Sequence, residues 1–349
     1  MKNNYKKITL GTFVYQNFSI KTMLCILGVF LIPQLCMLFI TKSFASLILI
    51  GITIFASVLV DVIYSYAKGE KNSWLYYTLV GCFIGFFLPN NYPPLLVFFV
   101  TFLALTLLRF FFAKEFSWIN PIALVVFFLF LILMPYFVSY SQDTFQNLYA
   151  ENSLQNLISE GKITVFSLDF TITDWLNTTV FTKVGFNIPY GYITLFWDSQ
   201  SIIPAFRFNC LTLVSSLFFF GFSIFTSIIP VIVLVTYLSL VKIFGAYAST
   251  LLYFQGDMLF SVLTCGVLFT IIFLIEWFGT IPTSRLGKFF YGIMTGLILF
   301  FFVGTGNSAV GAILTLVMAN IVSLLIQYLE HKYLIFVENR LSLLEVDKE

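Results

Sequence analysis

The segment SLDFTITDWLNTTVFTKVGF (Ser167–Phe186) lies in the one long stretch of the chain, residues 141–207, that has no apolar run long enough to cross a bilayer. A spanning helix needs about 20 mostly apolar residues, and such runs fill the chain on both sides of this stretch. They group into five segments before it and five after it. The sequence therefore predicts an all-α polytopic membrane protein of about ten helices, divided into two halves by a polar insert.

The composition of the 349 residues also indicates a membrane protein. Hydrophobic residues make up 60% of the chain and charged residues only 10%, whereas charged residues make up about 25% of a typical soluble domain. The formal net charge of +2 is too small to indicate a nucleic-acid partner, so membrane lipid is the expected environment. The five cysteines show no metal-ligand spacing and the single histidine follows the last apolar run, so we predict no metal site and no catalytic residue.

The apolar runs predict where the spanning helices lie. We expect them near residues 22–41, 44–66, 74–90, 93–112 and 120–140, and, after the insert, near residues 208–226, 228–247, 258–277, 287–303 and 308–328. The chain then divides into an N-terminal segment (1–21), a first half (22–140), the insert (141–207), a second half (208–328) and a tail (329–349).

The distribution of Lys and Arg predicts the topology, because cytoplasmic connections are enriched in both. With a cytoplasmic N-terminus, 13 of the 18 Lys and Arg residues fall on the cytoplasmic side and 5 on the other. We therefore expect both termini in the cytoplasm and the insert outside. Five helices per half is an odd number, so related halves would be inverted with respect to each other.

Two proline-containing interruptions occupy matching positions in the two halves. The third span ends in GFFLPNNYPP (Gly85–Pro94), and its counterpart in the second half ends in EWFGTIPTSR (Glu276–Arg285). In inverted repeats, broken helices often line a site near the middle of the membrane. Two ordinary proline-rich loops would give the same pattern, and the sequence leaves both interpretations open.

Few ionisable residues fall within the spans. Asp61 is expected to reach the membrane interface from the end of its helix. Glu276 either forms an ion path with Arg285 beside the Pro282 break or ends an ordinary helix. Asp257 is expected to cap the start of a helix.

The insert carries a cluster of polar side chains. Asp174, Asn177, Thr178, Thr179 and Thr182 form a small patch within a stretch that we predict to be β-prone, with a turn. A hydroxyl group in such a patch could accept a covalent group, although the composition alone does not require one. Asn120, by contrast, precedes Pro121 at the expected start of a span, which predicts a helix cap.

Four segments carry a resemblance to a known family. They are GCFIGFFLPNNYPPLL (Gly81–Leu96), FFFAKEFSWINPIALV (Phe110–Val125), FNCLTLVSSLFFFG through SIIPVIVLVTYL (208–238) and GDMLFSVLTCGVLFTIIFLIEWFGTIPTSRLGKFFYG (Gly256–Gly292). From about residue 22 to 330 the chain resembles the NqrB/RnfD family, the integral membrane component shared by two redox-driven ion pumps. These pumps are the sodium-translocating NADH:quinone reductase and the Rnf ferredoxin:NAD oxidoreductase.

The resemblance implies a fold, a cofactor and partners. The family has ten helices in two five-helix halves, and a threonine in a D-x-x-S-G-A-T motif is joined to FMN by a phosphoester. Carried over to this chain, the candidate cofactor-binding residues are Thr179, Thr178, Asp174, Asn177 and Asn120. The expected cofactor is FMN, with riboflavin as a second candidate. The expected partners are other subunits of an Rnf/Nqr-type complex in a bacterial inner membrane.

The chain departs from the family where the flavin should be attached. In Asp174-Trp-Leu-Asn-Thr-Thr-Val180, the aspartate is present, Asn177 replaces the serine, and Val180 stands at the acceptor position. The glycines and the acid that follow in the family are lost in SIIPAFRF (Ser201–Phe208). These departures leave three hypotheses: a divergent redox subunit that binds FMN, a flavin-free structural or assembly subunit, and a channel or transporter for a small solute or ion. If the chain takes part in an oxidoreductase, it is a non-autonomous subunit of one.

Overall fold

The computed structural model describes residues 19–112, 118–136, 158, 163–185, 187–247, 257–304 and 310–346. Every regular element within these ranges is a helix or helical turn, and the ranges contain no strand. The prediction of an all-α protein is therefore confirmed for the described part of the chain.

The helices that precede the insert begin close to the predicted positions, and α5 ends at Ile132, short of the predicted residue 140. They are α1 (Ile20–Ile40), α2 (Phe44–Lys68), α3 (Trp74–Phe86), α4 (Pro94–Leu107) with its π-helical continuation η1 (Leu108–Phe112), and α5 (Pro121–Ile132). Local signals set several of these starts. Ser19 and Asn120 accept hydrogen bonds from first-turn N–H groups, and Pro94 and Pro121 stand at first helical positions, where a missing N–H costs nothing.

The helices that follow the insert differ from the prediction at two places. They are α11 (Asn209–Gly221), α12 (Ile228–Tyr247), α13 (Met258–Thr264), α14 (Val267–Phe269) with its π-helical continuation η4 (Thr270–Leu274), α15 (Arg285–Val303) and α16 (Gly311–Val346). The single span predicted at 258–277 is broken at Gly266, whose φ of +63° favours glycine. Helix α16 continues through the predicted tail as far as Val346.

Five of the described helices are long and apolar enough to cross a membrane: Ile20–Ile40, Phe44–Lys68, Pro94–Phe111, Arg285–Val303 and Gly311–Val337. Helices α3, α5 and α11 and the stretch Ile228–Phe244 of α12 are apolar but shorter. Large apolar side chains such as Leu95 and Phe301 are 72% and 80% exposed. Such surface is stable in contact with lipid, so the chain is a multi-pass membrane protein.

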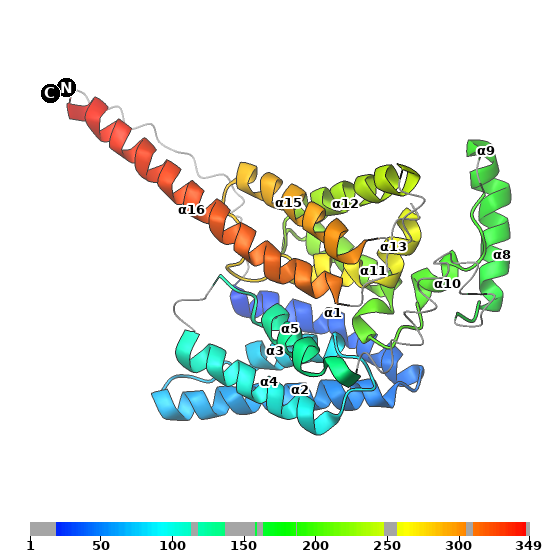
Figure 1. Cartoon of the computed structure of the whole chain (residues 1–349), viewed down its shortest axis with the longest axis horizontal. Helices are drawn as coiled ribbons and strands as arrows, with labels where there is room; N and C mark the ends of the chain where they lie inside the picture. The colour runs from blue at the N-terminus through cyan, green and yellow to red at the C-terminus, as the bar shows by residue number, and fades with distance from the viewer. Residues whose placement is uncertain are drawn as a thin grey trace, which may run out of the picture.

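The helices before and after the insert form two packed groups (Figure 1). In the first group, α2 packs on α3 and α4, and both α3 and α4 pack on α5. In the second group, α12 packs on α15 and η4, and both α15 and η4 pack on α16. The two groups meet where α1 contacts α11 and where α5 contacts α16.

Glycine pairs spaced four residues apart bring two helix pairs into close contact. Gly81 and Gly85 on α3 face α2, and Gly292 and Gly296 on α15 face α12. A Cβ atom on Gly81 or Gly85 would lie 2.6 Å from the backbone of α2, and one on Gly292 or Gly296 would lie 2.8 or 2.7 Å from side chains of α12. Small residues at this spacing let helix backbones approach each other within a membrane. The G-x-x-x-G spacing is visible in the sequence, but the predicted fold did not use it.

The described part of the insert lies at one end of the bundle (Figure 1). It comprises α8 (Ser167–Leu176), its π-helical continuation η2 (Asn177–Phe181), α9 (Thr182–Val184), α10 (Tyr192–Trp197) and the short turn η3 (Pro204–Phe206). Helix α8 runs across the end of the bundle, whereas the C-terminal part of α16 projects from the opposite end.

Candidate functional site

The insert segment with the candidate residues is helical, so the prediction of a β-prone stretch is wrong. Its threonines are compatible with a helix because their hydroxyl groups bond to carbonyl groups one turn earlier. Thr178 Oγ1 donates to the Asp174 carbonyl oxygen at 2.8 Å, and Thr179 Oγ1 donates to that of Trp175. Tertiary contacts around Asp169 then outweigh the local preference for a strand.

Asp169 fixes the start of α8 to the start of α10. Its side chain is buried and accepts hydrogen bonds from Thr173 Oγ1 (3.0 Å), Gly191 N (3.0 Å), Thr194 N (2.7 Å) and Thr194 Oγ1 (2.7 Å). A buried carboxylate with this many donors is well compensated for its loss of hydration. The sequence did not reveal this role, because the four-residue spacing of Asp169 and Thr173 has meaning only once a helix is assumed.

The predicted residues Asp174 and Asn177 hold the following loop against the helix. The Asn177 amide exchanges two hydrogen bonds of 2.9 Å with the backbone of Ile188. Asp174 Oδ1 accepts a 2.7 Å hydrogen bond from the Tyr190 hydroxyl group, and this bond raises the pKa of the Tyr190 phenol. Asp174 and Asn177 therefore hold the loop that contains Ile188 and Tyr190 against the helix that carries Thr178 and Thr179.

The surroundings of Thr178 and Thr179 allow covalent attachment of a flavin but do not enclose one. Thr178 is exposed and Thr179 is partly exposed, so each hydroxyl group can be reached for covalent attachment. The neighbouring cavity, lined by residues that include Thr173, Leu176 and Tyr192, has a volume of about 160 Å³. Ligand pockets usually measure about 300–1,000 Å³. The described residues thus offer an attachment point, but this cavity is too small to enclose a flavin.

Asn120 lies inside the helix bundle, with partners other than the insert threonines. Its side-chain oxygen caps α5 by accepting hydrogen bonds from Ile122 N (3.0 Å) and Ala123 N (3.4 Å), which confirms the predicted cap. Its amide nitrogen donates to the Leu274 carbonyl oxygen at 3.2 Å. Asn120 therefore joins the two helix groups, because α5 belongs to the first and η4 to the second.

Asp61 is fully buried, so the prediction that it reaches the membrane interface is wrong. Its carboxylate lies 2.9 Å from Arg109 Nη2 and accepts a 2.8 Å hydrogen bond from Ser73 N. The Arg109 guanidinium lies 4.3 Å from the ring centres of both Tyr64 and Tyr77. An ion pair with aromatic contacts compensates for the burial of both charges. Asp61 and Arg109 are 48 positions apart in the sequence, which gave no signal for the pairing.

The two acidic residues of the second group, Glu276 and Asp257, have different hydrogen-bond partners. Glu276 is buried and accepts hydrogen bonds from Thr226 N (2.8 Å) and Thr226 Oγ1 (2.7 Å), so its carboxylate is bonded at the start of α12 instead of to Arg285. Asp257 accepts a hydrogen bond from Phe260 N at 3.0 Å, which confirms its predicted role as a helix cap. It also accepts a hydrogen bond from the Tyr192 hydroxyl group of α10.

Replacing Glu276 by Ala should destabilise the protein by about 1–3 kcal/mol, because the partly buried donors of Thr226 would lose their acceptor. Glu276→Gln keeps one acceptor oxygen and should lose less. Thermal unfolding of the two variants in detergent measures the difference. Equal midpoints for Glu276→Ala and the wild type would show that water or lipid head groups satisfy Thr226 equally well.

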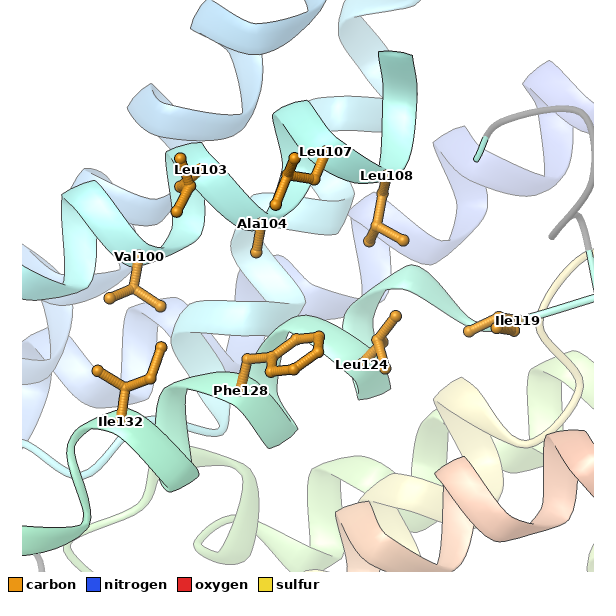
Figure 2. Close-up of a pocket in the computed structure, with 9 residues that line it drawn as sticks. All are labelled: Val100, Leu103, Ala104, Leu107, Leu108, Ile119, Leu124, Phe128 and Ile132. Atoms are coloured by element: carbon orange, nitrogen blue, oxygen red, sulfur yellow. The ribbon is translucent and has the colours of Figure 1, made fainter. Parts of the chain in front are cut away.

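One groove among the described residues offers no polar chemistry. It lies between α4 and α5, and Figure 2 shows side chains of the two helices facing each other across it. Its volume is about 360 Å³, and its lining residues are Val100, Leu103, Ala104, Leu107, Leu108, Ile119, Leu124, Phe128 and Ile132. A groove of this composition on a membrane protein suits an acyl chain, and it contains no side chain that could act as an acid, a base or a nucleophile.

A comparison with models of known protein families assigns the chain to one of them. The model of the NQR2, RnfD, RnfE family matches residues 7–335. No curated protein matches the chain significantly. The match covers both helix groups and the insert between them, and it agrees with the resemblance found in the sequence. The chain therefore belongs to the NQR2, RnfD, RnfE family.

Proposed function

We propose that this chain is an integral membrane subunit of a redox-driven, ion-translocating electron-transport complex of the Rnf/Nqr type, in a bacterial inner membrane. The observation that carries the proposal is the family match over residues 7–335, on a chain whose helices are long and apolar enough to span a membrane. The subunit works with other subunits of the complex. Its own role is to position groups within and at the surface of the bilayer.

The proposed architecture is a pair of inverted five-helix halves on either side of the insert. Its support is the matching set of helix contacts in the two groups. The groups contact each other through equivalent members, the first helices α1 and α11 and the last helices α5 and α16. Such pairing is the pattern expected when two repeats are related by a two-fold axis.

We further propose that FMN is linked to Thr179 or Thr178 at the insert end of the bundle. The accessible hydroxyl groups on a helix held by Asp174 and Asn177 support this proposal. When bound, the flavin would accept and donate electrons at that membrane surface. A flavin-free structural subunit is the second candidate, favoured by the small size of the cavity beside the threonines.

Flavin fluorescence on a denaturing gel tests this proposal. We expect the purified wild-type band to fluoresce, because a phosphoester survives denaturation. Thr179→Ala or Thr178→Ala should abolish the signal if the replaced residue is the acceptor. Thr182→Ala, one turn further along the same helix, is the matched control and should keep it.

The other outcomes decide between the two candidates. Fluorescence that persists in both threonine variants would place the flavin elsewhere in the chain. A protein that copurifies with other complex subunits and carries no flavin, bound or covalent, would favour the structural subunit. A protein that copurifies with none of them would contradict the proposed function.

A further inference from the structure

Helix α8 leaves an apolar stripe without a protein partner among the described residues. Leu168, Ile172 and Trp175 lie three or four positions apart and so share one side of the helix. Their side chains are 69%, 39% and 59% exposed. Thr179 lies four residues beyond Trp175, and none of the four residues carries a charge.

The remaining surface of α8 is divided into a protein-facing side and a water-facing side. Asp169 and Thr173 are buried against the start of α10. Thr171 and Asp174 are exposed and polar. The apolar stripe lies between these two sides, because successive residues turn by 1/3.6 of a revolution. A helix that touches protein, lipid and water at once needs this order of faces.

The position of α8 agrees with that division. It runs across the end of the bundle, whereas α2 and α15 run along the bundle (Figure 1). A helix parallel to the bilayer plane, with Trp and Leu on one side, is typical of helices that lie in the head-group region. Trp197 of the insert is also exposed, and Trp is enriched at membrane–water interfaces.

The apolar surface of the bundle continues onto α8. Leu176 of α8 and Leu259 of α13 line the same small cavity. Leu259 is 51% exposed at the start of α13. We propose that α8 is a surface helix whose stripe of Leu168, Ile172 and Trp175 inserts into the bilayer at the insert end of the bundle. This contact holds Thr179 at the membrane surface, whether or not a cofactor is attached to it.

Tryptophan quenching in nanodiscs of the full chain tests the proposal. The emission of Trp175 is the difference between the wild type and Trp175→Phe. We expect lipids brominated near the head-group end of the acyl chain to remove most of this emission, and aqueous iodide to leave most of it. As a matched control, Phe170→Trp combined with Trp175→Phe places a tryptophan on another side of α8, beside Tyr190, which Phe170 contacts at a ring distance of 5.0 Å.

The control tryptophan should respond in the opposite way, with loss of emission in iodide and little loss in brominated lipid. Quenching of Trp175 by iodide and not by brominated lipid would overturn the proposal, because the stripe would face water and await a protein partner. Protection of Trp175 from both quenchers would overturn it as well, since another part of the chain would then cover the stripe. Both conservative replacements are at exposed positions, so the variants are expected to fold.

Discussion

Replacing Asp61 by Ala should destabilise the protein by about 3–5 kcal/mol, the cost typical of leaving one charge of a buried ion pair without its partner. Arg109 would keep its contacts with Tyr64 and Tyr77 but lose its counter-charge, which lies at 2.9 Å. The N–H group of Ser73 at the start of α3 would lose its acceptor too. The change thus affects three helices at once, because Asp61 belongs to α2, Ser73 precedes α3, and Arg109 belongs to η1, the continuation of α4.

Thermal unfolding in detergent and the monodisperse fraction after size-exclusion chromatography measure this effect. The double variant Asp61→Leu with Arg109→Met is the informative control, because replacing a whole buried pair by apolar residues is often neutral or stabilising. We expect the double variant to be more stable than Asp61→Ala. If Asp61→Ala and the double variant were equally stable, the two residues would not act as a pair.

The sequence predicted the helices well because membrane spans follow from a strong local signal. Helix α2 was expected at 44–66 and runs from Phe44 to Lys68, and α12 was expected at 228–247 and occupies those residues. The break at Gly266 was not predicted, because a single glycine in a mostly apolar run is compatible with an unbroken span, and the close approach of the Phe206 ring to Gly266 is visible only in the folded chain. Long-range packing of this kind has no counterpart in a local hydropathy pattern.

The candidate site was only partly accessible from the sequence. The sequence located the polar cluster from Asp174 to Thr179 but predicted a β-prone stretch, whereas the structure has it in one continuous helical segment. The bonds that give Asp174 and Asn177 their roles go to Tyr190 and Ile188. The pairings of Asp61 with Arg109 and of Glu276 with Thr226 join residues far apart in the chain. A single sequence shows the polar residues in a membrane segment but does not show which of them meet.

Gly81→Ala should destabilise the protein by about 1–3 kcal/mol, the usual cost of adding atoms to a closely packed contact. The new Cβ atom would lie 2.3 Å from Ser57 Oγ and 2.6 Å from the Ile54 Cα atom. Rotation of a side chain can move the first atom but not the second, so α2 and α3 must separate. Separation would also weaken the 2.7 Å hydrogen bond from Ser57 Oγ to the Tyr77 carbonyl oxygen.

Gly51→Ala is the matched control, since Gly51 lies within α2 and has no atom within 4 Å of an added Cβ. Alanine is favoured over glycine inside a helix by about 0.5–1 kcal/mol, so this control should be stabilised while Gly81→Ala is destabilised. Unfolding midpoints of both variants and the wild type, measured in the same detergent, show whether each substitution raises or lowers the stability. Equal midpoints would show that close approach of α2 and α3 does not depend on Gly81. A lower midpoint for Gly81→Ala together with a higher midpoint for Gly51→Ala would mean that close helix–helix contact, and not helix propensity, determines where this bundle requires glycine.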